Sequence, residues 1–318
     1  MTSRHRDDRR EQRTAVMVPV QRIGHATYAT PDLARQVAYY TEIIGFTAAE
    51  RGRDRAVLTT RLGHEVLVLE AGAAAQCTRV SFQIAPDFDL NRAIAHFSKQ
   101  GVRSERRTGI TPGIADAVVF ADPKGTEIEL FSAFDEAAPR GTIHGIAPMK
   151  LGHQAFIVPD AKSMTDFYCD NLGFRVSDWM EDFFSFLRCG TDHHTVNFRT
   201  GAKTFMHHIA FELQDWAHMH TACETLGIHK VPILWGPLRH GIGHNIAIYH
   251  RDPDDHIVEF YTEMDQMKNE ALGYFDPRPW HEDRPQRPKV WDRHSGAIVW
   301  GTPPAPDYLR SRPAMPAR

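Results

Sequence analysis

An internal repeat constrains the fold of this chain more than any other feature of its 318 residues. Three residue pairs, Gly-His, Pro-Asp and Gly-Phe, recur at an offset of 128, first at 24–25, 31–32 and 45–46 and again at 152–153, 159–160 and 173–174. Near the end of each copy an Asp-Pro turn leads into an acidic and apolar run, at an offset of 130. Self-similarity at a fixed offset indicates duplication, so we expect two domains of about 125 residues each.

Each copy has the same predicted order of strands and helices. A short apolar strand, at 26–29 and at 154–158, ends at the Pro-Asp pair, which starts an amphipathic helix. Three strands, a second helix and two last strands follow. In the first copy the three strands are predicted at 56–60, 65–70 and 79–84 and the helix at 90–100. In the second copy the three strands are predicted at 183–188, 194–199 and 207–213 and the helix at 215–226. This pattern predicts an α+β fold that is built twice.

The segments that flank the two copies differ from them in composition. Residues 1–18 are rich in Arg and lack an apolar period, so we expect a flexible Arg-rich arm. Residues 19–135 and 149–265 form the two predicted domains, and residues 266–318 form a tail. The tail holds nine of the 20 prolines, which excludes a single helix, and three of the 6 tryptophans, which predicts that it packs on the body.

The composition excludes several classes of function. Lys and Arg total 37 against 40 Asp and Glu, for a net charge of -3, so the chain has no general positive field to hold nucleic acid. No apolar stretch reaches the length of a membrane span, and the first residues lack the apolar core of a secretion signal. The four cysteines form no Cys-x-x-Cys pair. We therefore expect a cytoplasmic protein with reduced thiols that binds neither nucleic acid nor membrane.

Histidines are abundant, with 19 in the chain, and the repeat indicates which of them can hold a metal. His153 opens the first strand of the second copy, His208 lies in a later strand, and Glu259 lies in the last one. Two neutral imidazoles and one carboxylate on the inner face of a sheet form a facial triad that leaves coordination positions open. This ligand set favours Fe(II), with Mn(II) as the alternative, and predicts that the second domain is catalytic.

The first copy lacks the full ligand set. Its equivalent residues are His25, Arg79 and Glu129. A guanidinium cannot lose its proton to bind a metal, and its charge repels one. We therefore expect one metal per chain, in the second domain, and a first domain without metal in which Arg79 pairs with Glu129.

Residues 20–265 resemble the vicinal oxygen chelate superfamily of glyoxalases, bleomycin resistance proteins and dioxygenases, and within it the type I extradiol catechol dioxygenases. The resemblance implies two pairs of βαβββ modules, with the second pair closing a barrel-like cup round the metal. It implies a small-molecule catechol and O2 as substrates, with ring cleavage next to the two hydroxyls, in the degradation of aromatic compounds. It also implies a homo-oligomer, since these folds commonly assemble as multimers.

The resemblance assigns roles to residues as well. His153, His208 and Glu259 match the metal ligands of the family. His240 and Tyr249 match the pair on the substrate side, where they can hydrogen-bond the bound catechol oxygen and accept or relay its proton.

One of two adjacent histidines is expected beside the oxygen site. Alternation along a strand lets only one of His193 and His194 face inward, and the resemblance favours His193. His193 would stabilise the charge that develops on oxygen and later donate a proton. The same alternation points His207 away from the face of His208, so we expect a structural role for His207.

Two observations concern the substrate. Trp235 stands where members that take a carboxylate-bearing catechol have an Arg, which predicts a neutral aromatic substrate with an apolar substituent. Four aromatic residues that precede His193 fit either the wall of a ring pocket or the protein core: Trp179, Phe183, Phe184 and Phe186.

Two other functions from the same superfamily remain open. A metal-dependent isomerase or lyase of the glyoxalase type would take its ligands from two modules with more carboxylate, and would not need the set of His193, His240 and Tyr249. A non-catalytic small-molecule binding protein would lack the metal ligands altogether.

Overall fold

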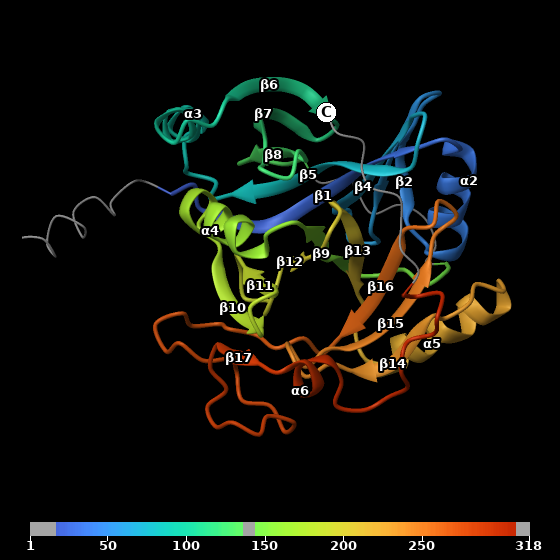
Figure 1. Cartoon of the computed structure of the whole chain (residues 1–318). Helices are drawn as coiled ribbons and strands as arrows, with labels where there is room; N and C mark the ends of the chain where they lie inside the picture. Colours follow the sequence, from blue (N-terminus) through green and yellow to red (C-terminus); the bar gives the residue numbers. More distant parts are fainter. Residues whose placement is uncertain (1–16, 136–143, 310–318) are drawn as a thin grey trace, which may run out of the picture.

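The computed structural model describes residues 17–135 and 144–309, which form two β-sheets (Figure 1). The first sheet has 8 strands and the second has 9. The predicted Arg-rich arm lies outside the described residues except for its last two positions, and so does most of the segment between the two predicted domains.

Each sheet contains two modules with the order strand, helix and three strands. In the first sheet these are β1 (Val20–Thr30), α2 (Leu33–Ala38), β2 (Thr47–Arg51), β3 (Arg55–Thr59) and β4 (Glu65–Ala71), then β5 (Gln76–Ile84), α3 (Leu90–Lys99), β6 (Ser104–Thr111), β7 (Ile114–Ala121) and β8 (Glu127–Phe131). A π-helical turn over Tyr39–Ile43 extends α2. Antiparallel pairing of β1 with β5 joins the two modules at the centre of the sheet.

The second sheet repeats this plan and curls into a half-barrel (Figure 1). Its modules are β9 (Lys150–Val158), α4 (Ala161–Leu172), β10 (Arg175–Met180), β11 (Phe184–Arg188) and β12 (Val196–Thr200), then β13 (Phe205–Glu212), α5 (Trp216–Ile228), β14 (Trp235–Arg239), β15 (Ile246–Arg251) and β16 (Ile257–Thr262). Antiparallel β9 and β13 join them. The predicted α+β fold of duplicated βαβββ modules is thus confirmed.

The first helices of the two halves start in the same way. The side chain of Asp32 accepts the backbone N–H of Arg35, and the side chain of Asp160 accepts that of Ser163, so each Pro-Asp pair supplies a helix cap. Gly173 ends α4 at a φ of 68°, a left-handed conformation that glycine adopts without a steric penalty. Among the described residues no helix combines the length and the apolar character needed to cross a membrane.

Five strands escaped prediction: β2, β10, one of the last three strands in each half, and β17 of the tail. In β10 a bulge between Val176 and Asp178 interrupts the pairing with β11. A bulge inserts an extra residue and so breaks the period of two by which a strand is recognised in a sequence. The bulge also matters for the site, because it places Asp178 in the interior, where its side chain is 1% exposed.

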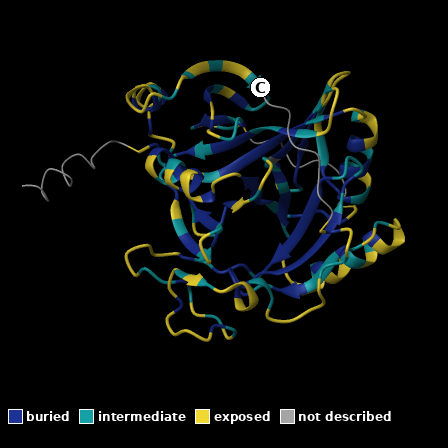
Figure 2. Ribbon diagram, viewed as in Figure 1, coloured by how far each residue is buried: buried dark blue, intermediate teal, exposed yellow. Residues whose placement is uncertain are grey.

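Apolar side chains of both sheets form one continuous core. Figure 2 shows the buried residues, in dark blue, along the strands of both sheets. Aromatic rings cross between the halves: Phe46 meets Phe211 at a centroid distance of 5.0 Å, and Phe82 meets Phe174 at 5.5 Å. The equivalent first strands β1 and β9 are also in contact. The two halves therefore pack as one body, and the strands β9 and β13 rest on the first sheet.

The tail lies along the second sheet. Its short strand β17 (Lys289–Trp291) pairs in parallel with β10, and helix α6 (Arg293–Ala297) follows directly. The indole N–H of Trp291 donates a hydrogen bond of 2.8 Å to Asp178. Residues far along the chain therefore extend the second sheet at the edge formed by β10.

The first half keeps a buried polar cluster at the place of the metal ligands, but with other partners than predicted. Arg79 pairs with Glu127 at 2.7 Å, because these residues face each other across β5 and β8. Glu129 instead accepts hydrogen bonds from Ser81 at 2.5 Å and from Thr111 at 3.0 Å. The prediction that Arg79 pairs with Glu129 is therefore wrong, since it rested on charge without the register of the strands.

Buried neutral histidines outside the predicted metal site predict a dependence of stability on pH. Burial, followed by the charges of Arg79 and Arg22, lowers the pKa of His25 from 6.5 to about 3, and burial lowers that of His250 to about 3. Below pH 6.5 these two histidines bind protons in the unfolded chain but stay neutral in the native protein. The stabilisation is therefore complete above pH 6.5 and is lost progressively as the pH falls toward 3.

We expect the free energy of unfolding to fall over this interval by about 1.4 kcal/mol per pH unit for each of the two histidines. Urea unfolding of the metal-free protein between pH 7 and pH 5 measures this slope. His25→Asn should make the slope of the unfolding free energy with pH shallower by the contribution of one histidine. Equal slopes in the variant and the parent protein would contradict the assignment.

Candidate metal centre and substrate cavity

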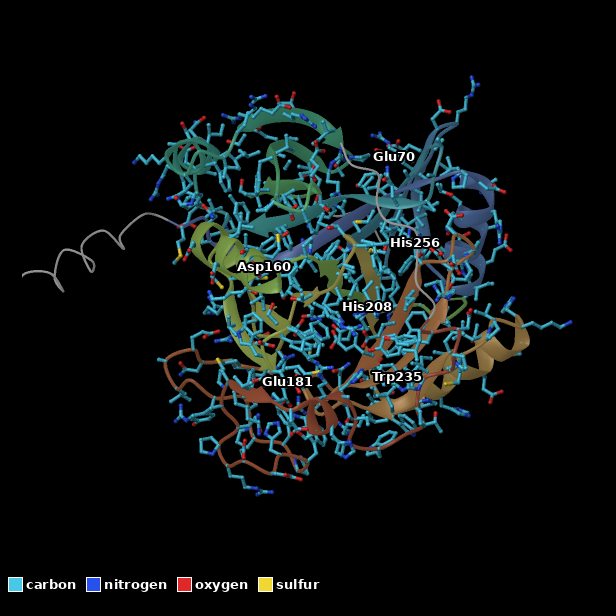
Figure 3. The ribbon with its side chains drawn as sticks, viewed as in Figure 1. Glu70, Asp160, Glu181, His208, Trp235 and His256 are labelled. Atoms are coloured by element: carbon cyan, nitrogen blue, oxygen red, sulfur yellow. The ribbon has the colours of Figure 1, made fainter. Side chains whose placement is uncertain are left out.

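Three neighbouring strands of the second sheet bring the predicted metal ligands together. His153 lies on β9, His208 on β13 and Glu259 on β16, and Ala210 of β13 pairs with both His153 and Glu259. Oε2 of Glu259 is 3.1 Å from Nε2 of His153 and 3.2 Å from Nε2 of His208. The ligating atoms lie within 4.8 Å of one another, and Figure 3 places His208 inside the curl of the second sheet.

The chemistry of this donor set fits a divalent cation. Nε2 of His208 is buried without a hydrogen-bond partner, a rare condition for a buried polar atom. Burial, followed by the neighbouring His207 and His153, holds the pKa of His208 well below its ordinary value, so the ring is neutral and can coordinate. Two imidazoles and one carboxylate with open positions form the ligand set of non-haem Fe(II) centres, and carboxylate ligands also suit Mn(II).

Two polar side chains hold the ligands from behind. Nδ2 of Asn245 donates a hydrogen bond of 3.0 Å to Oε1 of Glu259, which leaves Oε2 for the metal side. Nδ1 of His207 lies 2.7 Å from Nδ1 of His208. A His208 that coordinates through Nε2 carries its proton on Nδ1 and donates it to His207, so this contact fixes the orientation of the ligand ring.

The expectation that His207 points away from the site is wrong. A bulge in β13 sets two residues, His207 and His208, against one position of β9 and breaks the strict alternation. As a result the ring of His207 lines the cavity and meets the ring of Tyr308 edge-on, with centroids 5.8 Å apart. The register of β13 against β9 determines this orientation, and the spacing of residues in the sequence does not predict it.

A close approach explains the glycine that precedes each repeated histidine. A Cβ atom at Gly152 would come within 1.8 Å of the hydroxyl oxygen of Tyr261, whose ring lies 5.2 Å from that of His153. In the first half a Cβ atom at Gly24 would come within 2.7 Å of the ring of Phe131. The Gly-His pair therefore meets a packing requirement that both halves share, independently of the metal.

His240 and Tyr249 form a hydrogen-bonded pair at the cavity. Nδ1 of His240 donates to the carbonyl oxygen of Ala297 at 2.7 Å, so Nε2 of the neutral ring accepts from the Tyr249 hydroxyl at 2.8 Å. Burial lowers the pKa of His240, and burial together with the charge of Glu259 raises that of Tyr249 well above its ordinary value. Both groups are therefore neutral, and the phenol oxygen can accept a further hydrogen bond.

The structure reverses the predicted orientation of the adjacent histidines. His194 lines the cavity, and its ring lies 4.3 Å from that of His153, centroid to centroid. His193 lies behind it, with Nε2 at 3.0 Å from Oδ2 of Asp178 and its ring against Phe275. The prediction that His193 faces the metal is therefore wrong, because its buried acidic partner lies on the side away from the cavity.

The triad opens into a cavity of about 330 Å³. Apart from the ligands and the polar residues around them, most of the lining is apolar or aromatic, and two arginines, Arg199 and Arg293, also contribute to it. The apolar and aromatic part includes Ile157, Met180, Phe183, Phe184, Phe186, Trp235, Ile242, Tyr308 and Leu309. Trp179 packs against the core instead. Of the four aromatic residues that fitted either role, three line the cavity and one belongs to the core.

A second buried group has the composition of a metal site but a different bonding pattern. Nδ1 of His244 and Nε2 of His281 each contact one oxygen of Asp265, both at 2.8 Å. Although burial alone would raise it, these hydrogen bonds bring the pKa of Asp265 down to about 2. The nitrogen atoms that face Asp265 are thus hydrogen-bonded, unlike Nε2 of His208. Through His281 the group connects the tail to the second sheet.

Several side chains that contact the site were not predicted. Asn245 holds Glu259, and Asp178 with Trp291 holds His193. One signal for Asp178 exists in the sequence, since it is the acidic residue of a short run that also holds Val176, Trp179 and Met180. No local pattern links Trp291 to it, because the two residues lie 113 positions apart.

Comparison with known proteins assigns the chain to a family. The profile of the Glyoxalase/Bleomycin resistance protein/Dioxygenase superfamily matches residues 22–130 and again residues 150–260. The chain belongs to this superfamily. The two matches coincide with the two sheets, so the repeat is a duplication of the superfamily domain.

Relatives in this superfamily cover most of the chain. A manganese-dependent 2,3-dihydroxybiphenyl 1,2-dioxygenase from Geobacillus genomosp. 3 is 22% identical in an alignment of 303 positions that covers 86% of this chain and 93% of that protein. The Mn(II)-bound glyoxalase from Novosphingobium aromaticivorans is 25% identical, with a TM-score of 0.82, over 94% of this chain and 97% of that one. Homoprotocatechuate 2,3-dioxygenase from Brevibacterium fuscum, complexed with 3,4-dihydroxyphenylacetate, is 25% identical, with a TM-score of 0.79, over 93% of each chain.

Proposed function

We propose that this chain is an extradiol ring-cleaving dioxygenase, which inserts both atoms of O2 into a catechol-type aromatic diol at a non-haem Fe(II) centre, with Mn(II) as the alternative metal. The observation that carries the proposal is the buried triad of His153, His208 and Glu259 at the end of an aromatic cavity, with Nε2 of His208 unpartnered. Relatives and structural neighbours that bear the names of ring-cleaving dioxygenases support the reaction type.

The reaction needs little from the protein beyond binding and the handling of protons. When bound at the triad, Fe(II) or Mn(II) supplies open positions for the diol and dioxygen and a path for electrons between them. The ring-opened product contains every atom of the diol and of O2. The side chains of the cavity therefore have to take up the protons that the diol releases and return them to the product.

The pair of His240 and Tyr249 would take up a proton of the diol. The hydroxyl of Tyr249 donates to Nε2 of His240, so its oxygen can accept a hydrogen bond from a diol hydroxyl. As that hydroxyl ionises, Tyr249 can take its proton and pass its own to His240. Burial lowers the pKa of His240, while the negative charge of Glu259 and the carbonyl oxygen of Ala297 oppose this effect and favour the protonated imidazole.

His194 would hold and return a proton beside His153. Burial, followed by the neighbouring imidazoles of His153 and His193, keeps the pKa of His194 well below its ordinary value. Its ring is therefore neutral in the resting protein. Nδ1 of His194 contacts His193, so Nε2 on the opposite side of the ring is the atom available to the cavity.

The cavity favours a neutral diol with an apolar substituent. Trp235 lines the cavity and stacks on Tyr249, with ring centroids 5.3 Å apart and planes 22° apart. Two arginines line the cavity: Arg293 is 69% exposed and already pairs with Glu181 at 2.9 Å, and Arg199 lies over the ring of Phe183, 5.9 Å from its centroid. A carboxylate on the substrate would have to compete with these contacts, whereas an alkyl or aryl group would contact the aromatic wall.

Oxygen uptake measures the proposed reaction directly. The purified chain would be loaded with Fe(II) or with Mn(II) under nitrogen, its metal content determined, and air admitted with catechol, 3-methylcatechol, 2,3-dihydroxybiphenyl or 3,4-dihydroxyphenylacetate. We expect one O2 consumed per diol, a yellow ring-opened product, and faster turnover of the two apolar 3-substituted diols than of the carboxylate. Stoichiometric metal without oxygen uptake on any diol would overturn the proposal.

A glyoxalase-type isomerase or lyase is the second candidate. The TM-score of 0.82 to the Mn(II)-bound glyoxalase favours it. Conversion of 2-oxoaldehyde–thiol adducts by the metal-loaded chain, without consumption of O2, would support this candidate over the dioxygenase. Non-catalytic binding of aromatic diols remains the outcome if neither reaction occurs. A cytoplasmic location and a homo-oligomeric state stay predictions, which fractionation of cells and light scattering measure.

Loss of the phenol at the cavity should slow proton uptake from the diol. Tyr249→Phe removes the oxygen that accepts from the diol and leaves Nε2 of His240 without a donor, so we expect kcat to fall by about 100-fold while the metal content stays the same. Tyr39→Phe is a matched control, because Tyr39 makes an equivalent contact of 2.5 Å with Nε2 of His250 outside the cavity. Equal losses in the two variants would contradict the role of Tyr249.

A further inference from the structure

A chain of hydrogen-bonding groups runs from the cavity to the tail through the two adjacent histidines. Nδ1 of His194 lies 3.0 Å from Nδ1 of His193, and Nε2 of His193 lies 3.0 Å from Oδ2 of Asp178. The side chains of His193 and Asp178 are each 1% exposed. Neither residue lines the cavity, so both can act on a substrate only through His194.

The tail supplies the outer end of this chain. The indole N–H of Trp291 donates to Oδ2 of Asp178 at 2.8 Å, and the backbone N–H of Lys289 donates to Oδ1 at 2.7 Å. Both contacts depend on the parallel pairing of β17 with β10, in which Asp178 and Lys289 are partners. The tail therefore places an N–H donor against each oxygen of the buried carboxylate.

These contacts determine where the protons lie. An ionised carboxylate only accepts hydrogen bonds, so Nε2 of His193 donates to Asp178. A His193 with a single N–H then has no proton on Nδ1 and accepts there, so Nδ1 of His194 donates to it. Each neutral imidazole carries one N–H, and Nε2 of His194 is therefore a free lone pair on the side of the cavity.

We propose that Asp178 and His193 are positioning residues that hold His194 in its Nδ1–H tautomer, with Nε2 unprotonated toward the cavity, and that Trp291 and Lys289 of the tail complete this arrangement. The inference rests on the proposed function, in which His194 holds and returns a proton of the diol.

Asp178→Asn tests the proposal with little change in shape. An amide presents one oxygen and one NH2 group, so it cannot accept from His193, Trp291 and Lys289 at once. We expect a mixture of His194 tautomers, an anaerobic affinity for the diol and a metal content like those of the parent protein, and a kcat/KM for O2 lower by about 10- to 100-fold. Asp178→Glu should restore part of the loss, because it keeps a carboxylate.

The tautomer can be read without turnover. Long-range proton–nitrogen correlation spectra of the metal-free, full-length chain with 15N-labelled histidine distinguish Nδ1–H from Nε2–H, and His194→Asn identifies the signals of His194. We expect Nδ1–H in the parent protein and a changed pattern in Asp178→Asn. An Nε2–H form of His194 in the parent protein would overturn the proposal, whatever its activity.

Asp265→Asn is the matched control. Asp265 is also a buried carboxylate that ties the tail to the second sheet, through His281. Its side chain hydrogen-bonds His244 and His281 and acts on His193 through its charge alone, while its backbone oxygen accepts the N–H of His193, a bond that the substitution keeps. We expect Asp265→Asn to lower stability as Asp178→Asn does and to keep both the tautomer and the kcat/KM for O2. Equal losses of kcat/KM in the two variants would show a merely structural role and overturn the proposal.

The outcomes separate this inference from the proposed function. If the parent protein, with metal bound, consumes no O2 on any diol, the proposed function fails while the spectra still decide the tautomer. If the parent protein turns over and Asp178→Asn turns over equally fast for all O2 concentrations, the proposed function stands and the positioning role fails.

Discussion

Glu259→Gln is expected to remove most of the bound metal and to lower kcat by at least about a thousandfold, since loss of an outer-shell partner alone costs about 10- to 100-fold. Oε2 of Glu259 is within 3.2 Å of Nε2 of both His153 and His208, so it completes the ligand face. A neutral amide supplies neither the charge nor the lone pairs of a carboxylate. Metal analysis after gel filtration, together with oxygen uptake, measures both effects.

The duplicated half provides the control for this substitution. Glu129 occupies the equivalent place, is buried, and accepts hydrogen bonds from Ser81 and Thr111, which an amide oxygen can also accept. Burial raises the pKa of Glu129, so a neutral replacement is tolerated there. We expect Glu129→Gln to keep the metal and the activity. Retention of the metal by Glu259→Gln, or its loss from Glu129→Gln, would refute the assignment of the metal to the second half.

His194→Asn is expected to lower kcat by about 100- to 10,000-fold, the range typical of a lost acid–base group. The metal ligands and the pair of His240 and Tyr249 stay in place, so metal content and anaerobic diol binding should change little. Single-turnover mixing of the variant–diol complex with O2 isolates the affected step. Asparagine keeps a polar side chain at the cavity but cannot exchange a proton near neutral pH.

His193→Asn separates the two orientations of the adjacent histidines. With His194 at the cavity and His193 behind it, the His193 variant should lose less activity than the His194 variant, about 10- to 100-fold. The opposite order, with a nearly intact His194→Asn and an inactive His193→Asn, would support the assignment expected from the sequence resemblance and contradict the structure.

The order of strands and helices was predictable because it depends on residue patterns within short segments. The repeated Pro-Asp pairs indicate where a strand ends and a helix begins, and in the structure Asp32 and Asp160 cap these helices. His153, His208 and Glu259 could be chosen as candidate ligands because each lies at a recurrent place of the repeat, and the structure brings their ligating atoms within 4.8 Å. The unpredicted β10 has a bulge that removes the period on which strand prediction depends.

Side-chain orientation was predictable only where the strands are regular. The bulge in β13 turns His207 into the cavity. The register of β5 with β8 pairs Arg79 with Glu127 instead of Glu129. Alternation and charge, read from the sequence alone, led to the opposite result in both cases. Both corrections come from the way one strand aligns with another, which a single segment does not encode.

The sequence by itself determined the duplication, the α+β modules and the donor residues that can form a facial triad, because each depends on residue type and on spacing within a short segment. The tertiary structure decided which of His193 and His194 faces the cavity and joined Trp291 of the tail to Asp178. The reason is physical: a buried imidazole turns toward the partner that satisfies its nitrogen, and the acidic partner of His193 is held in place by residues more than a hundred positions away.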